Sequence, residues 1–302
     1  MTANARQGRR VTVPRGLPAA LRTAAAVLLP AVAACSCGTA AAPATLSPTH
    51  PASASPAPAA SAVPSPTPAR PAASAGGCQH TYIPSMFYPS SDWAQAIDTR
   101  PAPRVMLLNV DNGPGSAPVS HFQGVVRQAQ AAGITVLGYS STDYGQRPIA
   151  AVKAEVRQYR AWYGVNGILL DLTQGTPGEL SYYRELTGYI RATVPHAVVW
   201  LNPGDYPDPG FMSIADVVMV FEGSYAQYLA VQVPGWVSQY QPDRFVHVVY
   251  ATPRSDLASA VRLSRARRAG YLFVTNLPGS PNPYDAMPSY WPREVAAVTG
   301  AC

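Results

Sequence analysis

From Cys78 to its end, the sequence lacks an excess of charge of either sign. The 302-residue chain has a formal net charge of +6. Six of its arginines precede Cys78, namely Arg6, Arg9, Arg10, Arg15, Arg22 and Arg70. From Cys78 onward, 16 Lys and Arg residues balance 16 Asp and Glu residues. A domain that binds nucleic acid carries a basic face of its own. We therefore expect no nucleic-acid partner.

Recognisable metal ligands and phosphate-binding loops are also missing. The chain has four cysteines and five histidines, and none of their spacings is typical of a zinc site. Neither of the two standard glycine-rich phosphate-binding motifs is present. The sequence thus predicts no metal and no cofactor.

The N-terminal region has no apolar run long enough for a mature transmembrane helix. An arginine-rich start followed by the short apolar segment 23–34 is typical of a secretory signal, which we predict for residues 1–35. This segment ends in Val32-Ala33-Ala34-Cys35, which resembles a bacterial lipobox. Lipidation of Cys35 would make the protein a cell-surface lipoprotein held to the membrane. Ordinary cleavage, which leaves Cys35 free, would instead give a secreted protein.

Residues 36–77 have the composition of a tether. From Gly38 to Gly77 the chain is almost wholly Ala, Pro, Ser and Thr. Such a segment cannot bury a core, so we predict an extended, disordered linker. The remaining residues, 78–302, are predicted to form one domain, and we expect it to be a monomer.

Two of the four cysteines lie at the ends of this predicted domain. Cys78 opens it and Cys302 is its last residue. In an exported protein this arrangement favours a Cys78–Cys302 disulfide, because the two ends of a barrel lie close together. Two free thiols are the alternative.

The domain alternates short apolar runs with longer helical patterns. The strand-like runs are Thr81–Tyr88, Val105–Val110, Thr135–Tyr139, Gly167–Asp171, Ala197–Leu201, Val217–Glu222, Phe245–Tyr250 and Tyr271–Val274. Helices are predicted at Asp92–Ile97, His121–Ala132, Ala150–Tyr163, Glu179–Val194, Tyr225–Trp236 and Leu257–Ala269. Strands that alternate with helices indicate a parallel sheet. Eight such strands in about 225 residues favour an α/β fold of the (β/α)8 TIM-barrel type over an open sheet.

Two of the predicted strands end in a carboxylate. The run Gly167–Leu172 reads as a fully buried strand that carries Asp171 near its end, and Val217–Glu222 has the same form. The carboxyl ends of barrel strands are where such folds keep their chemistry. Asp171 could instead cap the following helix. Two strands of this form favour chemistry, so we predict Asp171 and Glu222 as a catalytic pair.

Amides, hydroxyls and aromatic side chains follow several of the strands. The candidates for substrate binding are Tyr88, Asn109, Tyr139, Tyr144, Asn202, Tyr225, Thr275 and Asn276. Taken singly, each aromatic residue is more often a packing residue, and Asn202-Pro203-Gly204 alone is a turn. Together they would line one mouth of a barrel with groups that suit a sugar, because amides and carboxylates bond hydroxyls and aromatic faces stack on pyranose rings.

The order of these motifs resembles a known family. The segments that carry the resemblance are Tyr88-Pro89-Ser90, Asn109 with Asn112–Gly115, Gly138-Tyr139 with Thr142 and Tyr144-Gly145, Gly167 with Asp171, Asn202–Gly204, Phe221-Glu222 and Asn282–Tyr284. From about Tyr82 to Val298 the chain is similar to the spherulin-4-like glycoside hydrolases. The resemblance implies a (β/α)8 barrel that cleaves α-1,4-linked N-acetylgalactosamine polymers of secreted exopolysaccharide. The family's acidic residues map onto Asp171 and Glu222. The family usually has Asp-Glu where this chain has Asp171-Leu172.

Two carboxyl groups are what glycoside hydrolysis requires. One protonates the leaving oxygen, and the other acts as a nucleophile or activates water. We assign Glu222 as the general acid/base and Asp171 as the nucleophile or charge stabiliser, although the reverse assignment is open. The leading hypothesis is an exported hydrolase of an amino-sugar polysaccharide. The alternatives are a non-catalytic carbohydrate-binding barrel at the cell surface, which Leu172 favours, and a cell-wall scaffold.

Overall fold

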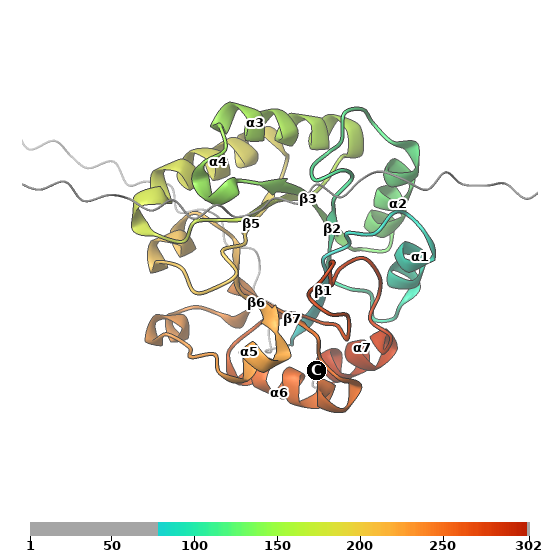
Figure 1. Cartoon of the computed structure of the whole chain (residues 1–302). Helices are drawn as coiled ribbons and strands as arrows, with labels where there is room; N and C mark the ends of the chain where they lie inside the picture. The colour runs from blue at the N-terminus through green and yellow to red at the C-terminus, as the bar shows by residue number, and fades with distance from the viewer. Residues whose placement is uncertain (1–77, 301–302) are drawn as a thin grey trace, which may run out of the picture. The chain divides into compact units, whose positions relative to one another are not determined.

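The computed structural model describes residues 78–300, and these residues form a closed barrel of eight parallel strands in sequential order (Figure 1). This confirms the predicted (β/α)8 TIM-like fold. The strands are β1 (His80–Ile83), β2 (Val105–Leu108), β3 (Thr135–Ser141), β4 (Gly167–Asp171), β5 (Val198–Leu201), β6 (Val217–Ser224), β7 (Phe245–Tyr250) and β8 (Tyr271–Val274).

The helices surround the barrel (Figure 1). They are α1 (Ser91–Asp98), α2 (Ser120–Ala131), α3 (Ile149–Gln158), α4 (Leu180–Thr193), α5 (Tyr225–Leu229), α6 (Leu257–Ala266) and α7 (Trp291–Thr299). A π-helical turn, Tyr159–Tyr163, extends α3, and a 3-10 helix, Pro209–Ser213, stands between β5 and β6.

Two predicted elements end several residues early, where proline follows, and one helix was not predicted. The first strand ends at Ile83 rather than Tyr88, because Pro84 has no N–H to continue the ladder. Helix α5 ends at Leu229 rather than Trp236, and Pro234 excludes helical backbone at the residue before it. Helix α7 was not predicted, since the Pro- and Ser-rich segment before it reads as a long loop.

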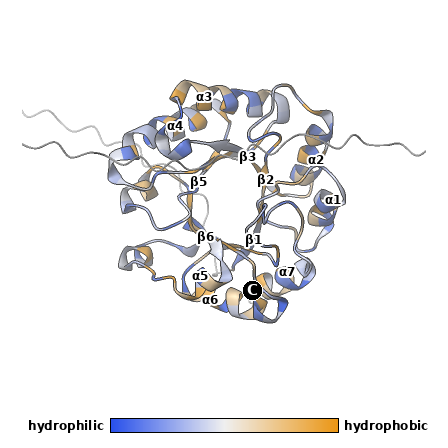
Figure 2. Cartoon of the chain, viewed as in Figure 1, coloured by the Kyte–Doolittle hydropathy of each residue, from blue (hydrophilic) through white to orange (hydrophobic). Residues whose placement is uncertain are grey.

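The strands are apolar because both of their faces are covered. Residues 167–170 of β4 and all of β2 are buried, as parallel strands under helices should be. Figure 2 shows hydrophobic residues along the barrel strands, whereas the helices carry hydrophobic and hydrophilic residues together. The helices thus place their apolar residues on the barrel and their polar residues in water.

Two glycines allow the strands and the outer layer to come close. A Cβ atom at Gly167 would lie 1.9 Å from the carbonyl oxygen of Val198 on the neighbouring strand. One at Gly138 in β3 would lie 2.6 Å from the ring of Tyr159. The Tyr159 hydroxyl reaches past this glycine and donates to the carbonyl oxygen of Leu108, 3.1 Å away. Glycine is therefore needed at both positions by contact rather than by backbone angle.

Strand β6 contains a bulge that the sequence did not reveal. Met219 pairs with Val246, and Phe221 pairs with the next residue of β7, His247, so Val220 has no partner. An extra residue of this kind reverses the in-and-out alternation of the side chains beyond it. As a result, Met219 and Glu222 both face the interior, although an unbroken strand would point them to opposite sides.

Several predictions concern residues outside the described range of 78–300. These are the signal peptide of residues 1–35, the lipobox at Cys35, the linker of residues 36–77, and Cys302 of the predicted disulfide with Cys78. Within the described range, none of the helices has the length and apolar character needed to cross a membrane.

Candidate active site

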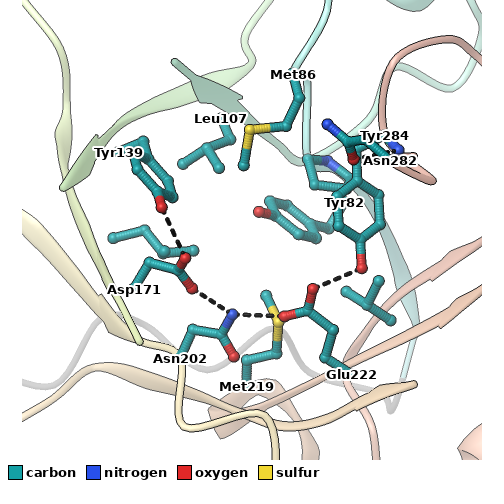
Figure 3. Close-up of a pocket in the computed structure, with 13 residues that line it drawn as sticks. Tyr82, Met86, Leu107, Tyr139, Asp171, Asn202, Met219, Glu222, Asn282 and Tyr284 are labelled. Carbon is teal, nitrogen blue, oxygen red and sulfur yellow. Dashed lines mark hydrogen bonds between the residues drawn. The ribbon is translucent and has the colours of Figure 1, made fainter. Parts of the chain in front are cut away.

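A pocket of about 220 Å³ opens at the carboxyl ends of the strands. It lies inside the barrel, and five of its polar side chains form a continuous chain of hydrogen bonds along one side (Figure 3). The lining residues are Tyr82, Pro84, Met86, Leu107, Tyr139, Leu169, Asp171, Asn202, Met219, Glu222, Val248, Asn282 and Tyr284. The pocket therefore combines two carboxyl groups and hydroxyls with an apolar floor, and it contains no cationic side chain.

Asp171 reaches the pocket by the regular alternation of β4. It is the last residue of the strand and faces the same side as Leu169, two residues earlier. The Tyr139 hydroxyl donates to Oδ2 at 2.9 Å, and the Asn202 amide donates to Oδ1 at 2.7 Å. These bonds fix the carboxyl group in one orientation.

Glu222 reaches the pocket because of the bulge in β6. The Tyr284 hydroxyl, from the loop between β8 and α7, donates to its Oε1 at 2.6 Å. The Asn202 amide donates to its Oε2 at 2.6 Å. Its backbone N–H donates to the carbonyl oxygen of Gly204 at 3.0 Å. Each carboxyl group thus has one tyrosine of its own and shares a single amide.

Asn202 connects the two carboxyl groups. It directly follows β5, and its Nδ2 atom donates to both Asp171 and Glu222 (Figure 3). The two accepting oxygens therefore lie no more than about 5.3 Å apart, the sum of the two hydrogen-bond lengths.

The pKa values of both carboxyl groups are raised, with different balances of causes. Burial raises the pKa of Asp171, and hydrogen bonds from Tyr139, the Leu172 backbone and Asn202 oppose the rise. Burial also raises the pKa of Glu222, and the negative charge of Asp171 raises it further. Tyr284 and Asn202 oppose that rise. Two adjacent carboxyl groups do not ionise independently. When the pair holds one proton, we expect it on Glu222, because Asp171 is the better stabilised as an anion.

Four of the predicted site residues lie together in this pocket. They are Tyr139, Asp171, Asn202 and Glu222. Tyr139 and Asn202 were predicted as substrate ligands, but their described hydrogen bonds go to the two carboxyl groups. These bonds orient the two carboxyl groups, and direct contact of Tyr139 and Asn202 with a substrate stays a prediction.

The other six predicted ligands lie outside the pocket. Tyr88 is 58% exposed, with its hydroxyl 3.3 Å from Nδ1 of His121. Tyr144 is 49% exposed, and Tyr225 is the first residue of α5. For these three, contact with a longer substrate stays a prediction.

Asn109, Thr275 and Asn276 hold loops in place. The side-chain oxygen of Asn109 accepts from the N–H of Gly113 at 2.9 Å. The Thr275 hydroxyl is buried and accepts from the N–H of Leu277 at 3.1 Å. The side-chain oxygen of Asn276 accepts from the N–H of Ser289 at 2.8 Å. These side-chain oxygen atoms therefore accept hydrogen bonds within the protein, and substrate contact by these residues stays a prediction.

Leu172 is the position at which the chain departs from the family pattern. It is the first residue after β4. Its φ of 49° is in the left-handed region, which is uncommon for a residue with a side chain. Its carbonyl oxygen accepts from the Tyr144 N–H and from the Thr142 hydroxyl, both at 2.7 Å. Leu172 does not line the pocket.

Sequence analysis did not single out two tyrosines of the pocket. Tyr82 lies in β1, inside an apolar run that reads as core. Tyr284 lies 62 residues beyond the carboxyl group that it contacts. The only available signal for Tyr284 was its place in the Asn282–Tyr284 motif of the family. In the described part of the chain, no group of three His, Cys, Asp or Glu side chains could hold a metal ion.

The closed parallel barrel with an acidic pocket at the carboxyl ends of its strands makes this protein a (β/α)8 barrel of the TIM type. More narrowly, residues 81–298 match the model of Spherulation-specific family 4, Spherulin4, and the chain belongs to that family. The family resemblance predicted from the sequence is thereby confirmed.

Comparison with individual proteins gives three relatives. The chain is 26% identical to Spherulin-4 of Physarum polycephalum over 229 residues, which cover 72% of this chain and 69% of that protein. It is similar in structure to Aspergillus clavatus Sph3 in complex with GalNAc, with a TM-score of 0.64 and 25% identity over 74% of this chain and 98% of Sph3. The glycoside hydrolase domain of Pseudomonas aeruginosa PelA matches with a TM-score of 0.42 and 17% identity, over 68% of this chain and 95% of that domain.

Proposed function

We propose that the protein is an exported glycoside hydrolase that cleaves an amino-sugar polysaccharide of the α-1,4-linked N-acetylgalactosamine type. The observation that carries this proposal is the pair Asp171 and Glu222, held by one shared amide in a sugar-sized pocket. The GalNAc bound to the related Sph3 supports the choice of sugar.

The distance between the carboxyl groups supports a retaining reaction. Retaining enzymes hold their two carboxyl groups about 5–5.5 Å apart, whereas inverting enzymes need about 6.5–9.5 Å to admit a water. The upper limit of about 5.3 Å between the two bonded oxygens fits the first class. Asp171 would then act as the nucleophile and Glu222 as the acid/base.

The first step forms a covalent intermediate. Glu222, protonated because burial and the Asp171 charge raise its pKa, gives its proton to the glycosidic oxygen. The ionised Asp171 attacks the anomeric carbon, the bond from that carbon to the glycosidic oxygen breaks, and the shortened polymer leaves as an alcohol.

The second step releases the sugar. Glu222, now a carboxylate, takes a proton from a water molecule whose oxygen attacks the anomeric carbon. The ester bond to Asp171 breaks, which regenerates the ionised Asp171 and the protonated Glu222. Tyr139 and Asn202 stabilise Asp171 as the leaving carboxylate by their hydrogen bonds.

The test uses the Asp171→Asn and Glu222→Gln variants with polymers of α-1,4-linked galactosamine of known acetylation. Each variant keeps the shape of the side chain and loses the charge or the proton. We expect new reducing ends from the wild type, at least a 1000-fold loss of turnover in each variant, and unchanged thermal unfolding. Near wild-type turnover by Glu222→Gln would remove Glu222 from the mechanism.

A carbohydrate-binding barrel without catalysis is the second candidate. Leu172 favours it, because the family usually has an acidic residue there. The same assay separates the two functions: a wild type that retains the polymer on affinity gels and never produces reducing ends would be a binding protein.

We propose that the protein acts outside a bacterial cell, held by a lipid on Cys35. The support is the sequence Val32–Cys35 after a short apolar segment. Detergent partitioning tests it, since Cys35→Ser should release the protein into the medium. We also propose the Cys78–Cys302 disulfide, which peptide mapping without reductant would detect. Equal release of the wild type and of Cys35→Ser would contradict the lipid anchor. Two free thiols at Cys78 and Cys302 would contradict the disulfide.

A further inference from the structure

Tyr82 is the pocket tyrosine whose hydroxyl is not used by the protein. It comes from β1, its side chain is 1% exposed, and its ring packs at 5.1 Å from that of Trp200. Its hydroxyl points into the middle of the pocket, on the open side of the hydrogen-bonded chain (Figure 3). A buried tyrosine hydroxyl usually has a hydrogen-bond partner, whereas the hydrogen bonds among the described residues of the pocket run from Tyr139 to Asp171 and from Tyr284 to Glu222 and do not include Tyr82.

The other hydroxyl donors and the Asn202 amide donor of the pocket are already committed, whereas the Oδ1 atom of Asn202, an acceptor, has no partner among the described residues. The hydroxyls of Tyr139 and Tyr284 donate to the two carboxyl groups, and both protons of the Asn202 amide do the same. The amide of Asn282 donates to Asp285 at 2.7 Å. Tyr82 therefore offers the hydroxyl proton that remains for a ligand.

The surroundings keep that proton in place. Burial raises the pKa of Tyr82 well above its usual value, and the charges of Glu222 and Asp171 raise it further. The hydroxyl is thus a donor at any pH at which the protein functions. It needs a ligand atom that accepts a hydrogen bond.

An acetamido carbonyl is the acceptor that fits best. Sugar hydroxyls can also donate, so the two carboxyl groups can satisfy them, whereas a carbonyl oxygen only accepts. The side chains of Leu107, Leu169 and Met219 supply an apolar lining against which the acetyl methyl can be buried.

We propose that Tyr82 contacts the substrate directly, donating its hydroxyl proton to the acetamido carbonyl of the sugar in the pocket and thereby selecting N-acetylated over free-amino units. The proposal rests on the proposed function for its substrate. A free amino sugar has no such carbonyl, so it leaves the buried hydroxyl unpaired. Sites built around a polar contact reject ligands that lack it, because the unpaired group is costly.

The experiment compares Tyr82→Phe with the wild type on two oligomers of α-1,4-linked galactosamine, one fully N-acetylated and one with free amines. Both turnover and binding are measured, with binding by calorimetry in the Glu222→Gln background. We expect Tyr82→Phe to lower kcat/KM and affinity for the acetylated oligomer by about 10- to 100-fold, as for the loss of a buried hydrogen bond. Values for the free-amine oligomer should change less than about 2-fold on the same reasoning.

Tyr206→Phe is the matched control. Its hydroxyl is buried without a partner among the described residues, but Tyr206 packs against Trp236 and does not line the pocket. Its removal should leave kcat/KM unchanged, and both variants should unfold at the wild-type temperature or above it.

The outcomes separate this proposal from the proposed function. Equal losses for the two oligomers would overturn the acetamido assignment, and no loss for either would overturn any contact with Tyr82. An acetyl-dependent loss of affinity without turnover in the wild type would support the contact and contradict hydrolysis. A wild type that binds neither oligomer would contradict both.

Discussion

Replacing Asn202 by leucine should move the whole pH profile of the reaction to higher pH. Leucine has nearly the shape of asparagine but cannot donate a hydrogen bond. The change therefore removes the 2.7 Å bond to Asp171 and the 2.6 Å bond to Glu222 in one substitution. Both bonds favour the ionised carboxylates and lower their pKa values, so their loss raises both.

The size of this shift follows from the strength of the lost bonds. A hydrogen bond to a charged group contributes about 1.5–3 kcal/mol, and about 1.4 kcal/mol corresponds to one pKa unit. The bond also persists in part with the protonated acid, so we take the lower half of this range. We expect each carboxyl pKa to rise by about 1–1.5 units on this basis.

The assay is kcat/KM for the acetylated polymer between about pH 3 and 9, a range that spans both expected limbs. The acidic limb reports ionisation of Asp171, and the alkaline limb reports loss of the Glu222 proton. Both limbs should move up, and activity below the optimum should fall most. Asn276→Leu is the control, because that amide lies outside the pocket and bonds Ser289. Unchanged limbs in a folded Asn202→Leu variant would refute the idea that the shared amide sets the two pKa values.

Two further predictions concern stability. Gly167→Ala should destabilise the barrel by more than about 3 kcal/mol or prevent folding, because the new methyl group would meet the backbone of Val198. The control is Gly188→Ala in α4, where the space is open, and it should be neutral or stabilise the protein by up to about 1 kcal/mol. Equal unfolding midpoints of the two variants in urea would contradict this prediction. Glu294 is fully buried with a strongly raised pKa caused by burial, so its contribution to stability is complete below its unfolded pKa and is lost as pH rises toward the folded value. Glu294→Gln should therefore gain thermal stability over the wild type as pH rises above about 4.5, and a constant difference from pH 4 to 9 would show that the pKa of Glu294 is the same in the folded and the unfolded protein.

The barrel was predictable because its signal is local. Each buried strand is a short apolar run between helical patterns, and eight such runs leave few alternatives to closure. The ends of elements were less predictable where a tertiary contact decides them. Helix α7 is an example: its buried Glu294 accepts the N–H of Val274 in β8, and nothing near residue 294 in sequence announces that partner.

The sequence predicted the site residues where side chains alternate regularly along a strand, and not where a bulge or a distant loop places them. Asp171 follows the period of its strand, so its place at the pocket could be read from β4 alone. The inward direction of Glu222 depends on the unpaired Val220, which no residue type marks. Tyr284 arrives from a loop that folds back over the barrel, and a contact across 62 residues leaves no local pattern.

The bulge in β6 makes the pairing of β6 with β7, rather than side-chain identity, the property that selects which residue enters the pocket. Phe221 now packs outside the strand against Tyr228, with ring centroids 4.7 Å apart, while Glu222 faces inward. Deleting Val220 would leave Met219, Phe221 and Glu222 in a regular ladder, so Met219 and Glu222 would both still face inward. A shift of one residue in pairing that brought Val220 into the ladder would instead turn Glu222 away from the pocket, without replacing any of the pocket's side chains.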